Sequence, residues 1–146
     1  MRNRILFSFL AWVAVIFSVQ GKQKDFVLQS GQPVAIACSG SEAPVVHTSL
    51  DLLSRDLQTV LSATAHVDTN TGNIIVGTIG QSKLIEQAGI DISVLKNKKQ
   101  AFLLTVSEDG KLVVAGSDSH GTAYTVITSE YKKIKSEVTY LSLIHI

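Results

Sequence analysis

The sequence predicts an α/β fold of the α+β kind: a two-layer sandwich in which two main helices pack on a mixed β-sheet. Apolar residues recur at helical spacing from Val46 to Leu61, with polar residues on the opposite side. Residues 74–76 form a continuous apolar run, which is typical of a strand buried on both faces. Because a one-sided helix needs a sheet to cover, the two observations together predict the layered fold.

Two short β-prone runs, 25–29 and 33–38, precede the long helix and are joined by residues 30–32. We expect these runs to form a hairpin. Pro44 suits the first turn of the helix, where its missing N–H costs nothing. The predicted buried side of the helix consists of Val46, Leu50, Leu53, Leu57, Val60 and Leu61.

Shorter elements follow in the middle of the chain. Residues 65–67 suggest a short strand, which the turn-rich segment 68–72 closes. After the buried strand, residues 82–88 predict a short helix, with Gly89 placed as its left-handed C-terminal cap.

A second hairpin is predicted for runs 101–106 and 111–115, because the pair Asp109-Gly110 between them marks a tight turn. Phe102 alternates with Leu104 in the first of these runs, and we expect it to fill the core.

The last predicted helix starts near Ser119 or Gly121. Residues 137–146 then offer a final strand. The apolar side expected for the last helix consists of Ala123, Val126, Ile127, Tyr131 and Ile134.

Residues 1–21 have the three-part pattern of a secretory signal peptide. The apolar run is shorter than the roughly 20 residues of a membrane span, so export is favoured over a permanent N-terminal anchor. We expect the mature chain to be secreted or periplasmic, touching a membrane only through the signal. The pattern consists of Arg2 and Arg4, the apolar run 5–17, and Val19 and Gly21 at the cleavage site.

Composition argues against several classes of function. Without the two arginines of the signal, 11 basic residues face 12 acidic ones, and this formal charge of −1 does not support nucleic-acid binding. Cys38 is the only cysteine, so no intrachain disulfide can form, and a buried strand thiol is expected. No two histidines have metal-ligand spacing, so we expect neither a metal nor another cofactor.

The segment from Gly116 to Thr122 has one feature of a nucleotide-binding loop and lacks another. Gly116 and Gly121 have the glycine spacing of a phosphate-binding loop. The lysine that would precede Thr122 and reach the phosphates is absent.

Ser117, Asp118 and His120 are the residue types of a hydrolytic triad. Neighbouring residues cannot easily place the base between the nucleophile and the group that orients the base. We therefore expect Asp118 or Ser119 to cap the following helix instead.

Glycoside hydrolysis needs two carboxyl groups that face each other across the sugar, about 5 to 10 Å apart. The acidic residues here lie largely at turns and on polar helix faces, where solvation explains them. Trp12 would leave with the signal, so few aromatic side chains remain to stack on a sugar. We expect no catalytic residue in this chain.

Four segments, in this order and spacing, resemble the N-terminal domain of the glycoside hydrolase family 115 α-glucuronidases. The resemblance covers residues 25–124 and implies an accessory fold like that of α-glucuronidases and β-hexosaminidases. The segments are a strand ending in Val76-Gly77-Thr78, a helix beginning near Ser82-Lys83-Leu84-Ile85, a strand bearing Phe102, and Ala115-Gly116-Ser117-Asp118 followed by Gly121-Thr122 and Tyr124.

Enzymes of this family are secreted glycosidases. The resemblance implies that they remove (4-O-methyl)glucuronic acid from xylan with inversion, through carboxylates on a catalytic barrel that follows this domain. The expected partners are that barrel in the same polypeptide and, for the intact enzyme, glucuronoxylan. The motif residues expected in a loop between the two domains are Gly116, Ser117, Asp118, Gly121, Thr122 and Tyr124.

Residues 125–146 depart from the family pattern, because the tryptophan-rich segment that opens the barrel does not follow Tyr124. We expect an accessory domain over 22–124 and a truncated or frameshifted tail after it. A second hypothesis is a free-standing exported binding or interaction module. A third, a small hydrolase using residues 117–120, is disfavoured by the triad argument.

Overall fold

The computed structural model describes residues 25–131 and 139–140, so the expected signal peptide lies outside the described residues. Within the described ranges, no helix is both long and apolar enough to cross a membrane. The elements are β1 (Val27–Leu28), β2 (Val34–Cys38), α1 (Pro44–Leu61), β3 (Ala65–Asp68), β4 (Ile74–Thr78), α2 (Lys83–Gln87), the 3₁₀ helix η1 (Ser93–Leu95), β5 (Phe102–Val106), β6 (Leu112–Gly116), α3 (Ser119–Tyr131) and β7 (Thr139–Tyr140).

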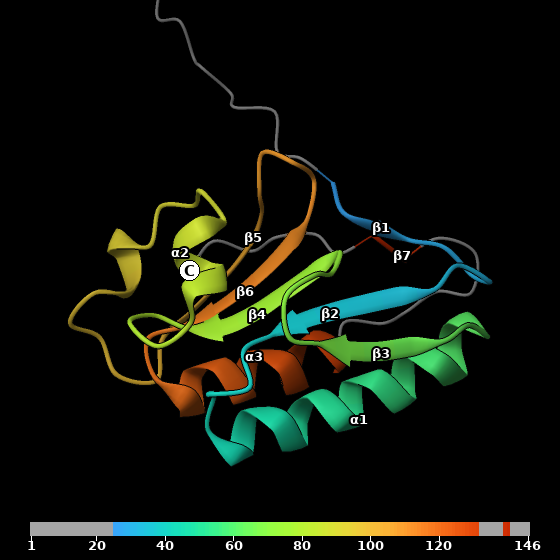
Figure 1. The fold of residues 1–146 in the computed structure, drawn as a ribbon, viewed down its shortest axis with the longest axis horizontal. Coiled ribbons are helices and arrows are strands. Elements are labelled where there is room, and N and C mark those ends of the chain that lie inside the picture. Colours follow the sequence, from blue (N-terminus) through green and yellow to red (C-terminus); the bar gives the residue numbers. More distant parts are fainter. Residues whose placement is uncertain (1–24, 132–138, 141–146) are drawn as a thin grey trace, which may run out of the picture.

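A mixed five-stranded sheet forms the centre of the domain, with the strand order β3-β2-β4-β6-β5 (Figure 1). The first four strands in this order run parallel, and β5 pairs antiparallel with β6. All five residues of β4 and all five of β6 are buried. The predicted central strand and the second hairpin are therefore confirmed.

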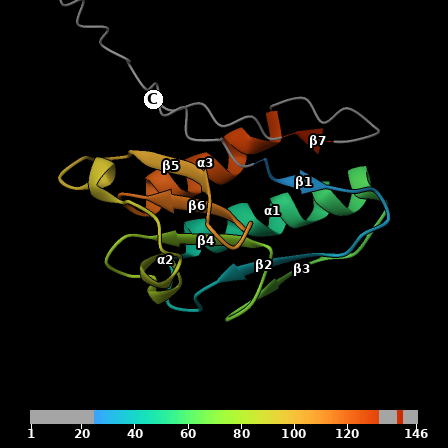
Figure 2. The same ribbon diagram turned by 90° about the horizontal axis from the view of Figure 1, so that it is seen from above.

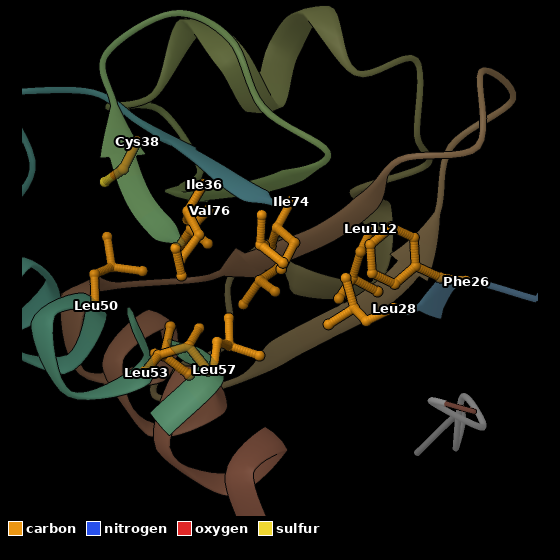
Figure 3. Close-up of a cluster of buried hydrophobic side chains, with 14 of the residues drawn as sticks. Phe26, Leu28, Ile36, Cys38, Leu50, Leu53, Leu57, Ile74, Val76 and Leu112 are labelled. Atoms are coloured by element: carbon orange, nitrogen blue, oxygen red, sulfur yellow. The ribbon is translucent and has the colours of Figure 1, made fainter. Parts of the chain in front are cut away.

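Helices α1 and α3 pack side by side on one face of the sheet, whereas α2 and η1 pack on the other (Figures 1 and 2). Leu50, Leu53 and Leu57 of α1 point at Ile36 and Val76 of the sheet (Figure 3). Each fully buried side chain of this size contributes roughly 1.5–3 kcal/mol. The predicted sandwich with two main helices is confirmed, and the short α2 and η1 add cover to its second face.

The hairpin expected for runs 25–29 and 33–38 is wrong. β1 pairs antiparallel with β7, with Val27 opposite Tyr140, while β2 lies between β3 and β4. The turn between β1 and β2 is tied instead to the end of α1, where the Gly31 N–H donates to the Leu61 carbonyl over 2.7 Å. A strand as apolar on both faces as β2 is most stable between two neighbours, which explains its central place.

Three side chains are less buried than the sequence predicts. Val60 is 41% exposed and Ile127 is 38% exposed, because each lies at the margin of its helix's buried side. Phe102 is only half-buried, because β5 is an edge strand. The side chain of Tyr131, and the whole of Ile134, lie outside what the structure describes.

The local signals of the turns and caps are confirmed. Gly89 has a φ of 65° just beyond Ala88, the C-cap of α2, and Gly110 has a φ of 82° in the turn between β5 and β6. Both values lie in the left-handed region that glycine adopts at no steric cost. Helix α3 begins at Ser119, one of the two predicted positions, and continues past position 124 to Tyr131.

Candidate functional site

The motif residues of the sequence meet at the carboxyl ends of β4 and β6. Thr78, the last residue of β4, is the register partner of Gly116, the last residue of β6. The hydroxyl oxygens of Thr78 and Thr122 lie 2.9 Å apart, and both side chains are fully buried. Two motifs that are 44 positions apart in the chain are thus one packed unit.

Glycines make this packing geometrically feasible. A Cβ on Gly116 would lie 2.3 Å from the backbone nitrogen of Thr122, and one on Gly77 would lie 2.5 Å from Cβ of Ser82. A Cβ on Gly121 would lie 2.5 Å from the carbonyl oxygen of Ala101. Since real side chains essentially never approach so closely, each glycine allows a helix start or a strand end to pack directly on its neighbour.

Glu42 completes the buried polar cluster from the loop before α1. Its carboxylate accepts the Thr78 N–H over 2.7 Å and the Thr78 hydroxyl over 2.8 Å. Glu42 is 5% exposed. A buried carboxylate is stable only where donors replace the lost water, and Thr78 supplies two of them.

Nothing in the sequence patterns singled out Glu42. The signal that could have identified it is its position: it lies in the short loop between the buried strand β2 and α1, where strand carboxyl ends and helix N-termini gather.

Asp118 caps the start of α3, as one of the two sequence alternatives predicts. One oxygen of its carboxylate accepts the Gly121 N–H over 2.8 Å, and the other accepts the Gln100 N–H over 2.7 Å. The hydrogen bond from Gln100, followed by that from Gly121, lowers the pKa of Asp118 below its ordinary value. Asp118 therefore joins α3 to the segment that enters β5.

Ser117 serves the same junction, because its Oγ accepts the Ala101 N–H over 2.9 Å. Ser117 and Asp118 are thus both engaged with backbone groups, while His120 is exposed. This geometry gives Ser117 and Asp118 structural roles and does not form a triad.

The glycine spacing of 116 and 121 does not make an anion site. Thr122 fills the space beside Gly116, and the Thr78 N–H already donates to the Glu42 carboxylate. A phosphate brought close to Thr78 would meet the carboxylate. Among residues 25–131 and 139–140, no group of three or more His, Cys, Asp or Glu side chains could hold a metal ion.

Cys38 is buried at the end of β2, as predicted, and is 1% exposed. Burial, together with the nearby Glu42, raises the pKa of its thiol to about 12. The thiol is therefore neutral and poorly nucleophilic at ordinary pH.

Of the six residues expected in an interdomain loop, Tyr124 is the one whose side chain is largely exposed, at 59%. Its ring lies against Phe102, with a centroid separation of 6.1 Å and an interplanar angle of 49°. The other five are buried or half-buried within the junction described above. Whether the loop also meets another domain stays a prediction.

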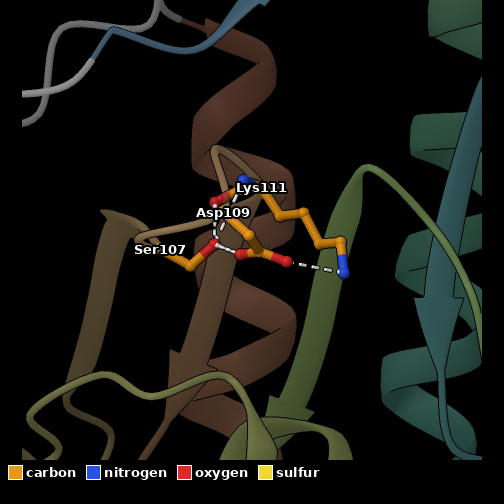
Figure 4. A network of polar contacts seen from close by, with 3 residues as sticks. All are labelled: Ser107, Asp109 and Lys111. Atoms are coloured by element: carbon orange, nitrogen blue, oxygen red, sulfur yellow. Dashed lines mark hydrogen bonds and ion pairs between the residues drawn. The ribbon is translucent and has the colours of Figure 1, made fainter.

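A separate polar network closes the turn between β5 and β6 (Figure 4). The Ser107 hydroxyl donates to Asp109, and the Lys111 ammonium lies 2.8 Å from the other oxygen of the same carboxylate. The bond from Lys111, then that from Ser107, lowers the pKa of Asp109. The Ser107 N–H also donates to the Lys111 carbonyl over 2.9 Å, so the hairpin closes through residues 108–110.

The fold is an α/β domain whose motif residues meet at one junction, and comparison with solved structures gives the family. BtGH115A, a family GH115 4-O-methyl-α-glucuronidase with specificity for decorated arabinogalactans, matches with 76% sequence identity and a TM-score of 0.75 over 81% of this chain. The chain spans 17% of that protein's length. The GH115 family recognised from the motifs is therefore confirmed, and this chain carries a domain of such an enzyme.

No protein-family model matches the sequence, and a search of curated proteins gives no match.

Proposed function

We propose that the chain is the non-catalytic N-terminal domain of an exported GH115-type glucuronidase that removes (4-O-methyl)glucuronic acid from a polysaccharide. The observation that carries this proposal is the match to BtGH115A, which has 76% identity with this chain yet is far longer than it. A domain so similar in sequence is expected to serve the same kind of enzyme.

The state of the acidic residues supports a non-catalytic role. A glycosidase needs a general acid whose pKa is raised so that it still carries a proton near neutral pH. Hydrogen bonds lower the pKa values of four aspartates here, and the Glu42 carboxylate is engaged with Thr78. The four aspartates are Asp68, Asp91, Asp109 and Asp118.

The domain's role, in this proposal, is to pack against the catalytic barrel of the same polypeptide. The exposed ring of Tyr124, supported by Phe102, is the part of the motif loop that can enter such an interface. Aromatic side chains with one face exposed are frequent anchors of interfaces.

Two polysaccharides are candidates for the whole enzyme. The family resemblance favours glucuronoxylan, whereas BtGH115A is specific for decorated arabinogalactans. Since the identity to BtGH115A is high, we propose decorated arabinogalactan as the first substrate to test.

The catalytic assignment is tested by incubating the purified protein with aldouronic acids, glucuronoxylan and glucuronic acid-decorated arabinogalactan. We expect no release of glucuronic acid. Release that disappears on replacing an acidic residue of this chain would refute the non-catalytic role.

The assignment to a larger enzyme is tested in extracts of the source organism, with an antibody raised against residues 25–131. A polypeptide several times longer than this chain, carrying glucuronidase activity, is expected in the exported fraction. Detection only of a product no longer than this chain would count against the proposal. N-terminal sequencing of the exported protein should begin at Lys22.

A free-standing interaction module remains the second candidate, and one observation favours it. Helices α1 and α3 cover one face of the sheet and α2 with η1 cover the other, so the described domain closes a core on both faces by itself. Binding of the purified protein to an envelope component or glycan, without any longer enzyme in the extract, would support this alternative.

A further inference from the structure

Strand β5 is an edge of the sheet whose outer side no strand pairs with in ranges 25–131 and 139–140 (Figure 1). Its inner side is fixed by the residues that flank it. The Ala101 carbonyl accepts the Ser117 N–H over 2.8 Å, and the Ser107 N–H donates to the Lys111 carbonyl over 2.9 Å.

Alternate residues of a strand direct their backbone groups to opposite sides. Leu103 and Thr105, which share the parity of Ala101 and Ser107, therefore bond to β6. The N–H and C=O groups of Phe102, Leu104 and Val106 point away from the sheet. The outer side of β5 thus offers three donors and three acceptors to an added strand.

The opposite edge of the sheet is partly covered. The outward carbonyl of Ala65 in β3 accepts the Ser54 hydroxyl over 2.8 Å and the Gln58 amide N–H over 2.7 Å, both from α1. Covering an edge with side chains in this way blocks further strand pairing. No such cover is found on the backbone groups of β5 within the described part of the chain.

A groove of about 300 Å³ follows β5. Every residue from Phe102 to Glu108 lines it, together with Gly89, Ile90, Asp91 and Val94. Consecutive residues of a strand face opposite sides of a sheet, so a groove that touches all of them runs along the strand's edge. The strand therefore borders open space between β5 and residues 89–94.

Charge at the two ends of β5 selects the occupant. The exposed lysines Lys96, Lys98 and Lys99 precede the strand, and the exposed Glu108 follows it, whereas the charge of Asp109 is already paired with Lys111. A second copy of β5, running antiparallel, places its basic end opposite the acidic end of the first. A two-fold axis then passes through Leu104, and Phe102 of each copy faces Val106 of the other.

We propose that β5 is a self-association edge, at which two copies of this chain pair antiparallel and join their sheets into one continuous sheet of ten strands. The three outward-facing residues of each copy make the hydrogen bonds. This contact is isologous, since the same residues serve on both sides and the pairing closes as a dimer.

Hydrogen exchange of the wild-type protein at low and high concentration tests the pairing directly. We expect the amides of Phe102, Leu104 and Val106 to exchange rapidly when dilute and slowly when concentrated. The amides of Leu103 and Thr105, which bond to β6, stay protected throughout. Outward amides whose exchange does not change with concentration would overturn the proposal.

Sedimentation of two matched variants provides the second measurement. Both Leu104→Ala and Leu104→Pro lose side-chain packing, but only the proline variant loses the outward N–H. We expect the alanine variant to dimerise and the folded proline variant to remain monomeric. A dimeric proline variant, or a wild-type protein that stays monomeric at high concentration, would overturn the proposal. If the proline variant does not fold, the hydrogen-exchange experiment on the wild-type protein provides the test.

The antiparallel direction is tested by exchanging charges. Lys98→Glu or Glu108→Lys alone should each weaken the dimer about fivefold, because every variant alters two symmetry-related sites of exposed charge. The double variant should regain the wild-type affinity. A double variant weaker than both single variants would exclude this pairing.

Discussion

Replacing Thr78 with valine is the most direct perturbation of the motif junction. The Thr78 hydroxyl lies 2.8 Å from the Glu42 carboxylate and 2.9 Å from the Thr122 hydroxyl, and the side chain is 2% exposed. Valine keeps the shape of threonine but removes the hydroxyl. The bond from the Thr78 N–H to Glu42 remains, so the variant isolates the contribution of the hydroxyl.

The expected cost follows from what is left without a partner. A hydrogen bond to a charged group contributes about 1.5–3 kcal/mol, and loss of one partner leaves the buried carboxylate short of a donor. Thr122 loses less, because its hydroxyl can donate to the Asp118 carbonyl, 3.1 Å away. We therefore expect Thr78→Val to lower the free energy of unfolding by about 2–3 kcal/mol, of the roughly 5–15 kcal/mol typical of a domain.

Urea unfolding followed by circular dichroism measures this loss, with an unchanged m-value as the check that only stability has altered. Thr59→Val is the control, because the Thr59 hydroxyl bonds the Arg55 carbonyl at an exposed site. The control should stay within about 0.5 kcal/mol of wild type. If Thr78→Val is as mild as the control, the Glu42 cluster does not stabilise the fold.

Three further predictions concern the core, the glycines and acid stability. Leu53→Asp should abolish cooperative unfolding, because Leu53 is only 8% exposed and the substitution buries a carboxylate. Leu52→Asp is the control and should be tolerated, because Leu52 is 42% exposed. Thermal denaturation compares the two variants. Gly116→Ala should lower the free energy of unfolding by about 1–3 kcal/mol, measured by urea unfolding. Gly40→Ala, with nothing within 4 Å of its added Cβ, should lower it far less. Because folding lowers the pKa of Asp118, its contribution to the free energy of unfolding is complete above the ordinary value of 3.8 and is lost as the pH falls through the folded pKa. Asp118→Asn should therefore lose less stability than wild type on acidification. Equal acid-unfolding midpoints for the two proteins would contradict this.

Local chemistry in the sequence determined most of the elements. The helical spacing from Pro44 to Leu61, the glycine after α2 and the Asp109-Gly110 turn each act over a few residues, so they could be predicted without knowing the fold. The cap at Asp118 belongs to the same class, because its oxygen bonds a backbone group three positions further on. The family motifs also stand in the sequence itself and gave the GH115 assignment that the solved structure confirms.

Only the tertiary structure decided which distant segments pair and which polar groups are buried together. The local β-preference of the run that forms β1 fits a hairpin with β2 as well as the actual pairing with β7. The actual pairing results because β2 is apolar on both faces and is buried between β3 and β4. Glu42 is an ordinary loop residue until Thr78, 36 positions away, supplies its donors. Phe102 is half-buried because β5 lies at the edge of the sheet, and strand order depends on long-range contacts that no local pattern encodes.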